Sequence, residues 1–284
     1  MIALYPLHRF REISQTAFIK VTHKRCAGYS LMRAHLEGKC GLEFGGPSSI
    51  FSSNHLVPIY NIAASIDGCN FAKQTLWAAN AGVRRFGPEL GEQLIMEASD
   101  PSRIANDAYD FVAASHVLEH VANPLRALME WKRIVRPSGT VLLVLPHKVH
   151  TFDHRRPFTT FSHIKSDFES NVSEEDLTHL DEIIALHDLD LDPPAGSRQQ
   201  FQQRCLQNAS KRAMHHHVFS PQVLAEMFAF LQMELVNLAV ERPHHIIVLA
   251  RKPRRNEATT LGPKNPSLSR NRSVRSDSLS LPRT

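Results

Sequence analysis

The clearest hydrophobic pattern lies in the middle of the chain. Two short, continuous apolar runs occupy residues 111–114 and 140–145, each bounded by polar or turn-forming residues. Runs of this length indicate strands that are buried on both faces of a sheet. Between them, Asn123 offers a helix N-cap, Pro124 suits the first turn, and apolar residues then recur at helical spacing. We therefore predict a strand, a helix and a parallel strand joined as a crossover, with a turn at 136–139.

The flanking sequence predicts the other elements of an α/β fold. Apolar runs and helical periodicities alternate on both sides of the crossover, separated by glycine, proline and polar residues. We predict further strands at 40–44, 59–66, 93–98, 233–240 and 245–250, and helices at 70–81, 174–187 and 219–231.

A glycine turn and an acidic residue follow the first two predicted strands. Gly45 and Gly46 allow the backbone to approach a ligand closely. Asp67 closes the second predicted strand, about 20 residues further on, where an acidic residue can bind both hydroxyls of a ribose. These residues favour a nucleotide-binding domain, although the turn is not the GxGxxG sequence of dinucleotide enzymes.

Three motifs stand close together in the crossover. They are Asp-Phe-Val at 110–112, Leu-Glu-His at 118–120 and Arg-Pro-Ser-Gly at 136–139. With the proline-capped helix between them, they resemble the class I S-adenosylmethionine-dependent methyltransferases, in the branch that acts on small molecules. The resemblance covers about residues 40–147, and the helix and strand pair predicted at 219–250 suit the antiparallel end of that fold. It implies an α/β fold, a Rossmann-like class I methyltransferase sheet with helices on both faces, to which this chain adds a His-rich insertion.

The resemblance also implies S-adenosyl-L-methionine as the cofactor and assigns residues to it. In this family the glycine turn passes under the methionine part and the acid after strand two binds the ribose. The segment after strand three meets the adenine, and the end of strand four lines the methyl-bearing side. The matching residues are, in that order, Glu43, Gly45 and Gly46; Asp67; Glu97, Ala98 and Ser99; and Ser115 and His116. Two residues depart from the family pattern, Pro47 in the turn and Glu97 in place of an aspartate.

The insertion at 147–217 is expected to form the acceptor site. Asp153 stands beside His154 in the loop after the fifth strand, so the carboxylate could orient the imidazole as a base. A base is needed when the acceptor is a hydroxyl, which must lose a proton. We therefore predict Asp153 and His154 as the catalytic residues, and O-methylation of a small molecule or a sugar-containing, glycan-type metabolite. His120 of the Leu-Glu-His motif is expected to pack or to hydrogen-bond, and not to catalyse.

The many histidines raise the alternative of a metal site. His179, His187 and the run His215–His217 could join Asp153 and His154 around an ion. No spacing typical of a metal motif enforces this arrangement, so the prediction is that the protein holds no metal.

Composition and charge support one folded unit with less regular ends. The chain has 284 residues, of which 42 % are hydrophobic. We divide it into an N-terminal helical leader at 1–38, a methyltransferase domain at 39–252 and a disordered basic tail at 253–284. Nine Lys or Arg residues and two acids lie between Arg251 and Thr284, so this stretch carries +7 and the rest of the chain about −2 of the net charge of +5. The folded part is close to neutral, which does not indicate a nucleic-acid-binding domain.

Cysteine use and hydropathy predict a cytoplasmic protein. The four cysteines show no CxxC spacing, as expected of reduced thiols. No apolar stretch approaches the ~20 residues that would span a membrane. The first 36 residues are basic with Glu12 as their only acid, which leaves a targeting segment as the alternative.

Two other functions fit the same residues. The irregular Gly45-Gly46-Pro47 turn would also suit a catalytically inactive methyltransferase fold that serves as a binding protein. The glycine turn followed by an acid would suit a nucleotide-sugar or dinucleotide oxidoreductase.

Overall fold

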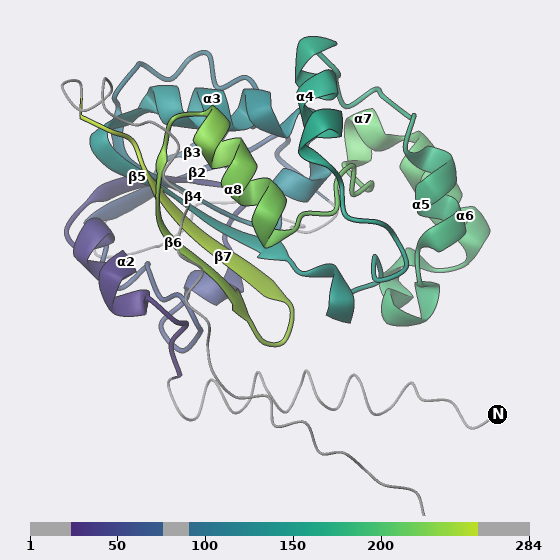
Figure 1. Ribbon diagram of the computed structural model, residues 1–284, viewed down its shortest axis with the longest axis horizontal. Coiled ribbons are helices and arrows are strands. Elements are labelled where there is room, and N and C mark those ends of the chain that lie inside the picture. Colours follow the sequence, from purple (N-terminus) through teal and green to yellow (C-terminus); the bar gives the residue numbers. More distant parts are fainter. Residues whose placement is uncertain (1–23, 76–90, 255–284) are drawn as a thin grey trace, which may run out of the picture.

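The computed structural model describes residues 24–75 and 91–254, and its centre is a seven-stranded sheet (Figure 1). The strand order is β3-β2-β1-β4-β5-β7-β6. Strands β1 to β5 run parallel, whereas β7 is antiparallel to both β5 and β6. The strands are β1 (Cys40–Phe44), β2 (Ser65–Asn70), β3 (Gln93–Ile95), β4 (Tyr109–Ser115), β5 (Val135–Pro146), β6 (Glu234–Glu241) and β7 (His245–Arg251). The predicted Rossmann-like sheet with an antiparallel end is confirmed.

Helices cover the sheet and build a separate lobe beside it (Figure 1). The α-helices are α2 (Tyr29–Leu36), α3 (Pro124–Ile134), α4 (Phe161–Glu169), α5 (Leu180–Leu186), α6 (Arg198–Leu206), α7 (Asn208–Lys211) and α8 (Pro221–Phe230). Short 3₁₀ helices occupy Ser49–Phe51, Leu118–His120, Lys148–His150, Leu189–Leu191 and Pro193–Ala195.

Helices α3 and α8, which pack on the sheet, each begin at a side-chain cap, and the cap of α3 is the one that the sequence predicts. The Asn123 side chain accepts a hydrogen bond from the Arg126 N–H at 3.1 Å, at the start of α3. At the start of α8, the Ser220 hydroxyl accepts from the Val223 N–H at 3.1 Å. Each cap satisfies a backbone donor that the first helical turn leaves open, and each is followed by a proline that needs no donor.

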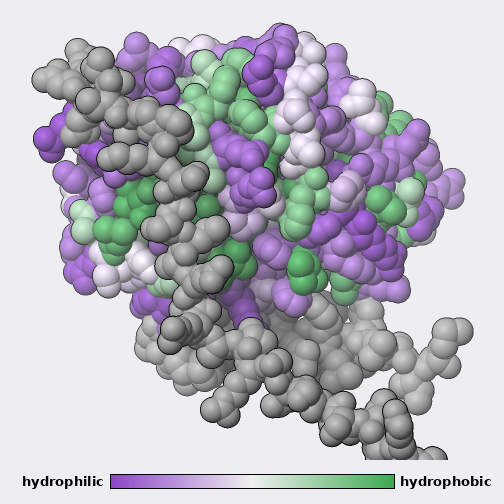
Figure 2. Space-filling model, viewed as in Figure 1, coloured by the Kyte–Doolittle hydropathy of each residue, from purple (hydrophilic) through white to green (hydrophobic). Residues whose placement is uncertain are grey.

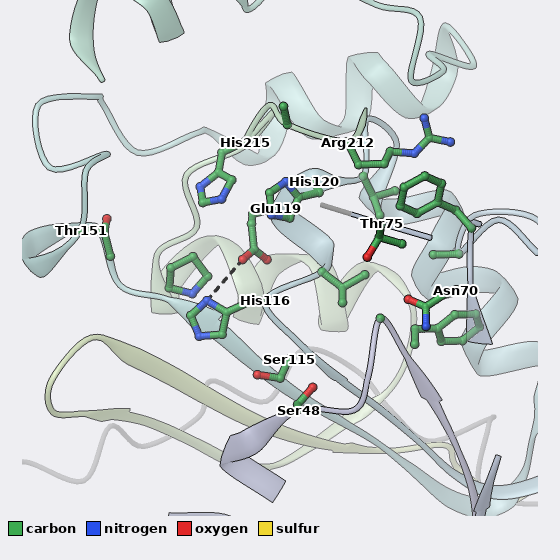
Figure 3. Close-up of a pocket in the computed structure, with 18 of the residues that line it drawn as sticks. Ser48, Asn70, Thr75, Ser115, His116, Glu119, His120, Thr151, Arg212 and His215 are labelled. Atoms are coloured by element: carbon green, nitrogen blue, oxygen red, sulfur yellow. Dashed lines mark ion pairs between the residues drawn. The ribbon is translucent and has the colours of Figure 1, made fainter. Parts of the chain in front are cut away.

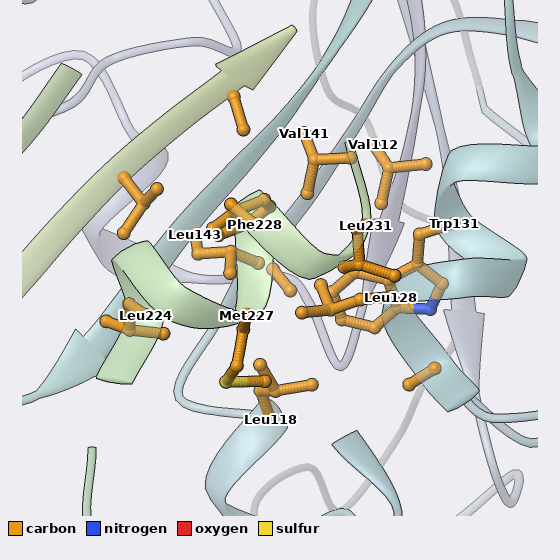
Figure 4. Packing of buried hydrophobic residues seen from close by; sticks show 14 of the residues in the cluster. Val112, Leu118, Leu128, Trp131, Val141, Leu143, Leu224, Met227, Phe228 and Leu231 are labelled. Atoms are coloured by element: carbon orange, nitrogen blue, oxygen red, sulfur yellow. The ribbon is translucent and has the colours of Figure 1, made fainter. Parts of the chain in front are cut away.

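Alternation along the central strands sends apolar side chains into two cores. On β5, Leu143 belongs to the core under α3 and α8, whereas its neighbour Leu142 belongs to the core under α2. The first core includes Trp131, whose ring stacks on Phe44 with a centroid distance of 4.8 Å and whose indole N–H donates to the Ala98 carbonyl at 2.8 Å. Figure 4 shows side chains of α3 and α8 meeting those of the sheet in this core. A sheet that is buried on both faces explains why its central strands read as continuous apolar runs.

One predicted strand is wrong, and one predicted turn is folded into a strand. Strand β2 spans Ser65–Asn70 and not 59–66, because the earlier apolar residues form tight turns whose side chains fill the core under α2. The predicted turn at 136–139 lies within β5, where it forms a bulge. Tyr109 pairs with Val135, and the ladder to β4 resumes at Phe111 and Thr140.

The 147–217 insertion has a small core of its own. Ile183, Phe201 and Met214 are buried there, among α5, α6 and the segment before α8. The helix predicted at 174–187 is shorter, Leu180–Leu186. Residues 71–75 are not helical, and the remainder of the helix predicted at 70–81 lies outside the described residues. The same holds for 1–23 of the predicted leader and for 255–284 of the predicted tail.

The surface carries hydrophobic residues mostly in separate groups among hydrophilic ones, on the face that Figure 2 shows. Among residues 24–75 and 91–254, no helix combines the length and the apolar character needed to cross a membrane.

Candidate active site

A cavity of about 610 Å³ opens where the parallel strands end. Its walls come from the residues that follow β1, β2, β3 and β4, closed by parts of the insertion and of the β6–β7 hairpin. Open α/β sheets bind their ligands at this edge, and the volume lies within the range of about 300–1,000 Å³ that is usual for small-molecule sites.

The glycine turn after β1 forms one wall and is held from behind by Glu43. This buried carboxylate accepts hydrogen bonds from the Ser48 N–H at 3.0 Å, the Ser48 hydroxyl at 2.7 Å and the Tyr60 hydroxyl at 2.9 Å. A Cβ on Gly46 would lie 2.0 Å from the Glu43 carboxyl carbon, so this position has no room for a side chain. Glu43 and Gly46 therefore shape the turn without lining the cavity.

The residues of the turn that do line the cavity are Gly45, Pro47 and Ser48. Gly45 has a φ of +74°, and a Cβ there would meet the Val117 side chain at 2.2 Å. The turn departs from the family pattern in sequence, but its hydrogen bonds to Glu43 define it well. The hydrogen bonds to Glu43 therefore explain how the irregular Gly45-Gly46-Pro47 turn, which suggested an inactive fold, is held in place.

Asp67 does not stand where the prediction put it. It lies in the middle of β2, opposite Leu42, because the strand continues to Asn70. Its carboxylate accepts from the Tyr109 hydroxyl at 2.7 Å and from the Glu92 N–H at 2.8 Å, and it does not line the cavity. The side chain at the end of the strand is Asn70, which does line the cavity.

The segment after β3 lines the next part of the cavity with Met96, Glu97 and Ala98, whereas Ser99 is not part of its wall. Glu97 is already engaged, since its carboxylate lies 2.6 Å from the guanidinium of Arg212 in the insertion. The same guanidinium lies 4.8 Å from the centre of the Phe71 ring. Arg212 thus brings the insertion over the side of the cavity that the resemblance assigns to the cofactor.

Ser115 ends β4 and His116 follows it, and both line the cavity; their contact with the cofactor stays a prediction. His116 has a φ of 53°, and its N–H donates to the Val144 carbonyl at 2.9 Å. Its Nε2 lies 3.3 Å from Nδ1 of His245 in the β6–β7 hairpin. About a third of the His116 side chain is open to the cavity, but the surrounding walls desolvate it and lower its pKa to about 3. His116 is therefore neutral at physiological pH.

Glu119 and His120 of the Leu-Glu-His motif also line the cavity, together with His215 (Figure 3). Neither Glu119 oxygen has a hydrogen-bond partner among the described residues, and the nearest basic atom is Nδ1 of His116, at the longer ion-pair distance of 3.5 Å. Burial raises the pKa of Glu119 to about 7, against the opposing field of His215. His120 does hydrogen-bond, to the Met214 carbonyl at 3.1 Å, but it faces the cavity as well.

The predicted pair of Asp153 and His154 is wrong, because neighbouring side chains point to different partners. Oδ2 of Asp153 lies 2.6 Å from Nδ1 of His215, and its Oδ1 accepts from Arg156 at 3.1 Å. His154 lies 2.8 Å from the carboxylate of Asp188 and does not line the cavity. The carboxylate–imidazole pair of this site is therefore Asp153 with His215, which lie far apart in the sequence.

Charge stabilises this pair. Burial by itself would lower the pKa of His215, but the charge and the hydrogen bond of Asp153 outweigh it and raise the pKa. Burial likewise opposes ionisation of Asp153, yet His215 and Arg156 hold its pKa well below the usual range. Each group therefore favours the charged form of the other, and the His215 imidazole lies next to Glu119.

Three groups of side chains among the described residues have the composition of a metal site. Two of them belong to the cavity: His116 with His244 and His245, and Glu119 with His120 and His215. The third lies in the insertion, outside the cavity wall, and comprises His163, Asp167, His179 and His217. Of the residues suggested for a metal, His179 and His217 meet in this third group, whereas His154 and His187 belong to none.

The chain belongs to the methyltransferase domain family, whose sequence model matches residues 19–238. No curated protein sequence matches the chain. Similar solved structures include the putative methyltransferase in a complex with the Trm112 methyltransferase activator of Haloferax volcanii. It shares 12 % identity, with coverage of 86 % of this chain and 93 % of that one and a TM-score of 0.45.

Two further structures are similar at the same level. A putative methyltransferase of Bacillus halodurans C-125 shares 13 % identity, with coverage of 79 % of this chain and 97 % of that one and a TM-score of 0.46. A SAM-dependent methyltransferase of Methanosarcina mazei shares 14 % identity, with the same coverage of 79 % and 97 % and the same TM-score of 0.46.

Proposed function

We propose that this protein uses S-adenosylmethionine to methylate a hydroxyl group of a small molecule, with Glu119 as the base. The observation that carries the proposal is a buried carboxylate with a pKa of about 7 and two unpartnered oxygens, at the centre of the cavity in a methyltransferase domain. A base is most effective when its pKa lies near the working pH.

The cofactor half of the cavity suits the parts of S-adenosylmethionine in order. The turn at Gly45 and Ser48 would take the methionine part, and Met96 and Ala98 the adenine. At the end of β2, the Asn70 amide donates to the Gly46 carbonyl at 3.1 Å, which leaves its oxygen to accept from a ribose hydroxyl. A neutral amide makes weaker bonds than the carboxylate that is usual in the family.

The charge of the site suits a sulfonium. A cationic methyl donor would be repelled by a protonated imidazole beside it, and His116 avoids this because its pKa is lowered to about 3. Bound S-adenosylmethionine would supply the methyl group for in-line transfer to the acceptor oxygen. The residues of the chain then position the acceptor and accept its proton on Glu119, and positioning contributes much of the rate.

The acceptor half of the cavity is rich in hydrogen-bonding groups. Thr151, His215, His244 and His245 line it, and the Asp153–His215 pair places a positive charge within it. These groups favour a hydroxylated metabolite, such as one that contains a sugar, over an apolar acceptor. A cytoplasmic location stays the prediction made from the cysteines.

Calorimetry and turnover test the proposal in two steps. The wild type is expected to bind S-adenosylmethionine, and Asn70→Ala to bind it about five-fold more weakly, for the loss of about 1 kcal/mol of hydrogen bonding. No binding at high micromolar protein would remove the proposal, and equal affinity of the variant would remove Asn70 from the site. Glu37→Gln, at the exposed C-cap of α2, is the control.

In the second step, S-adenosylhomocysteine release is measured with a panel of hydroxylated metabolites. Glu119→Gln is expected to keep cofactor affinity and to lose turnover by about 10²–10⁴-fold. Unchanged turnover in this variant would exclude Glu119 as the base. Cofactor binding without turnover on any acceptor would favour the binding-protein alternative.

A further inference from the structure

The group of ligands in the insertion joins three segments that are distant in the sequence. His163 and Asp167 lie one turn apart on α4, His179 immediately precedes α5, and His217 lies shortly before α8. One ligand atom from each of the four lies within 4.8 Å of all the others. We propose that this group binds a divalent transition metal, with zinc as the best match, and that the ion holds three segments of the insertion together.

The distances between the ligand atoms fit a tetrahedral ion. Nε2 of His163 lies 3.2 Å from Nε2 of His179 and 3.3 Å from Oδ2 of Asp167, and that oxygen lies 3.6 Å from Nε2 of His217. Bond lengths of about 2.0–2.1 Å to zinc place neighbouring ligand atoms of a tetrahedron about 3.3 Å apart. The four side chains are therefore close to the required spacing already.

One carboxylate oxygen of this group has no hydrogen-bond partner in the part of the chain that the structure describes. Oδ2 of Asp167 is buried without a hydrogen-bond partner among the described residues, despite its proximity to the two imidazoles. Buried polar atoms normally have partners, so an atom of this kind points to a missing ligand. A cation would accept a lone pair from this oxygen and from the two imidazole nitrogens that now face each other.

His217 is the ligand that must rearrange its hydrogen bonding. Its side chain is fully buried, and Nε2 lies 3.1 Å from the Ala122 carbonyl oxygen. When Nε2 binds a metal, the proton moves to Nδ1, which is buried without a partner among the described residues, and the contact with the Ala122 carbonyl is replaced by the bond to the ion. His163 and His179 in turn exchange their mutual contact of 3.2 Å for bonds to the ion.

The donor set identifies the class of metal and its role. Three imidazoles and one carboxylate suit zinc or a neighbouring transition metal, whereas calcium and magnesium prefer oxygen ligands. Four protein ligands close the coordination sphere, as in structural zinc sites. Because His217 follows His215 by two residues, an ion held here would fix the segment that carries the imidazolium of the acceptor site.

Metal content and cobalt absorption test the site directly. The full chain, freed of any affinity tag, is expected to carry about one zinc per molecule by plasma mass spectrometry. Apo protein is expected to take up one equivalent of Co²⁺ and to show the strong visible absorption of tetrahedral cobalt. Zinc at about 100 times its Kd should raise the melting temperature by about 5–10 °C.

Four variants distinguish binding at this site from binding elsewhere. His163→Ala and Asp167→Asn are expected to lose the cobalt bands and the thermal shift, and both positions are partly exposed, so the fold should tolerate them. His35→Ala, on α2 and outside the three groups, should bind as the wild type does. A wild type without zinc or cobalt bands would overturn the proposal. Binding that survives both variants would also overturn it. Its loss in His120→Ala would then show that the ion occupies the cavity.

Discussion

Replacing Glu119 with glutamine is expected to make the fold more stable at alkaline pH while it removes the proposed base. Burial raises the pKa of this carboxyl from 4.5 to about 7. Between those two values the folded protein retains the Glu119 proton that the unfolded chain has released. The folded state binds more protons, and its stability therefore falls as the pH rises through this window. A shift of about 2.5 units at 1.36 kcal/mol per unit costs about 3 kcal/mol once the group is ionised.

Glutamine has the shape of the protonated acid and cannot ionise, so it avoids this cost. Urea unfolding of both proteins at pH 5 and pH 8 measures the effect. At pH 5 the variant should be more stable by about 1 kcal/mol at most, because unfolded Glu119 is only partly ionised just above its pKa of 4.5, and at pH 8 by about 3 kcal/mol. Titrations remote from Glu119 affect both proteins and cancel in the difference, whereas that of His215 is coupled to the Glu119 charge and contributes to it. An equal difference at both pH values would refute the raised pKa, and Glu37→Gln should give a difference near zero at both.

Three further substitutions probe the site. Asp153→Asn removes the buried carboxylate that Arg156 and His215 share, so Arg156 keeps only Glu182 as a charged partner, and urea unfolding should show a loss of about 3–5 kcal/mol; a loss below 1 kcal/mol would contradict the ion pair. Gly46→Ala places a Cβ 2.0 Å from the Glu43 carboxyl carbon, and calorimetry should show about tenfold weaker cofactor binding, or more; equal affinity would show that the turn adjusts freely. Asp67→Asn should leave cofactor affinity unchanged, since this side chain lies outside the cavity wall, and a clear loss would return the ribose role to Asp67.

The sequence predicts the sheet well because the signals for its central part are local. The apolar runs of β4 and β5 and the caps of α3 and α8 each depend on a few consecutive residues. The second strand is the exception. Apolar residues at 59–63 pack into the core from tight turns, whereas Ser65–Asn70 alternates polar and apolar residues and shows no continuous run. Because the predicted strand ends at residue 66 and not at 70, the sequence assigns the ribose role to Asp67, whereas we propose Asn70.

The acceptor site is less predictable because its contacts connect distant segments. Asp153 and His154 are neighbours in the sequence, but their side chains leave the backbone in different directions and meet His215 and Asp188. Periodicity and spacing describe one segment at a time, so they contain no information about such a pairing. The role proposed for Glu119 depends on burial, which likewise follows only from the complete fold.

The buried guanidinium of Arg156 connects the segments that form the acceptor site. Arg156 is 1 % exposed, and it donates to Asp153 and Glu182 and to the carbonyl oxygens of His215 and His216. A guanidinium presents five N–H donors in a rigid plane, whereas a lysine has three donors on one atom. Lysine at this position would keep the charge but could not reach acceptors on three segments at once. Arg156 thus positions both His215 and Asp153, the partner of the His215 imidazole. These contacts help to define the acceptor half of the cavity.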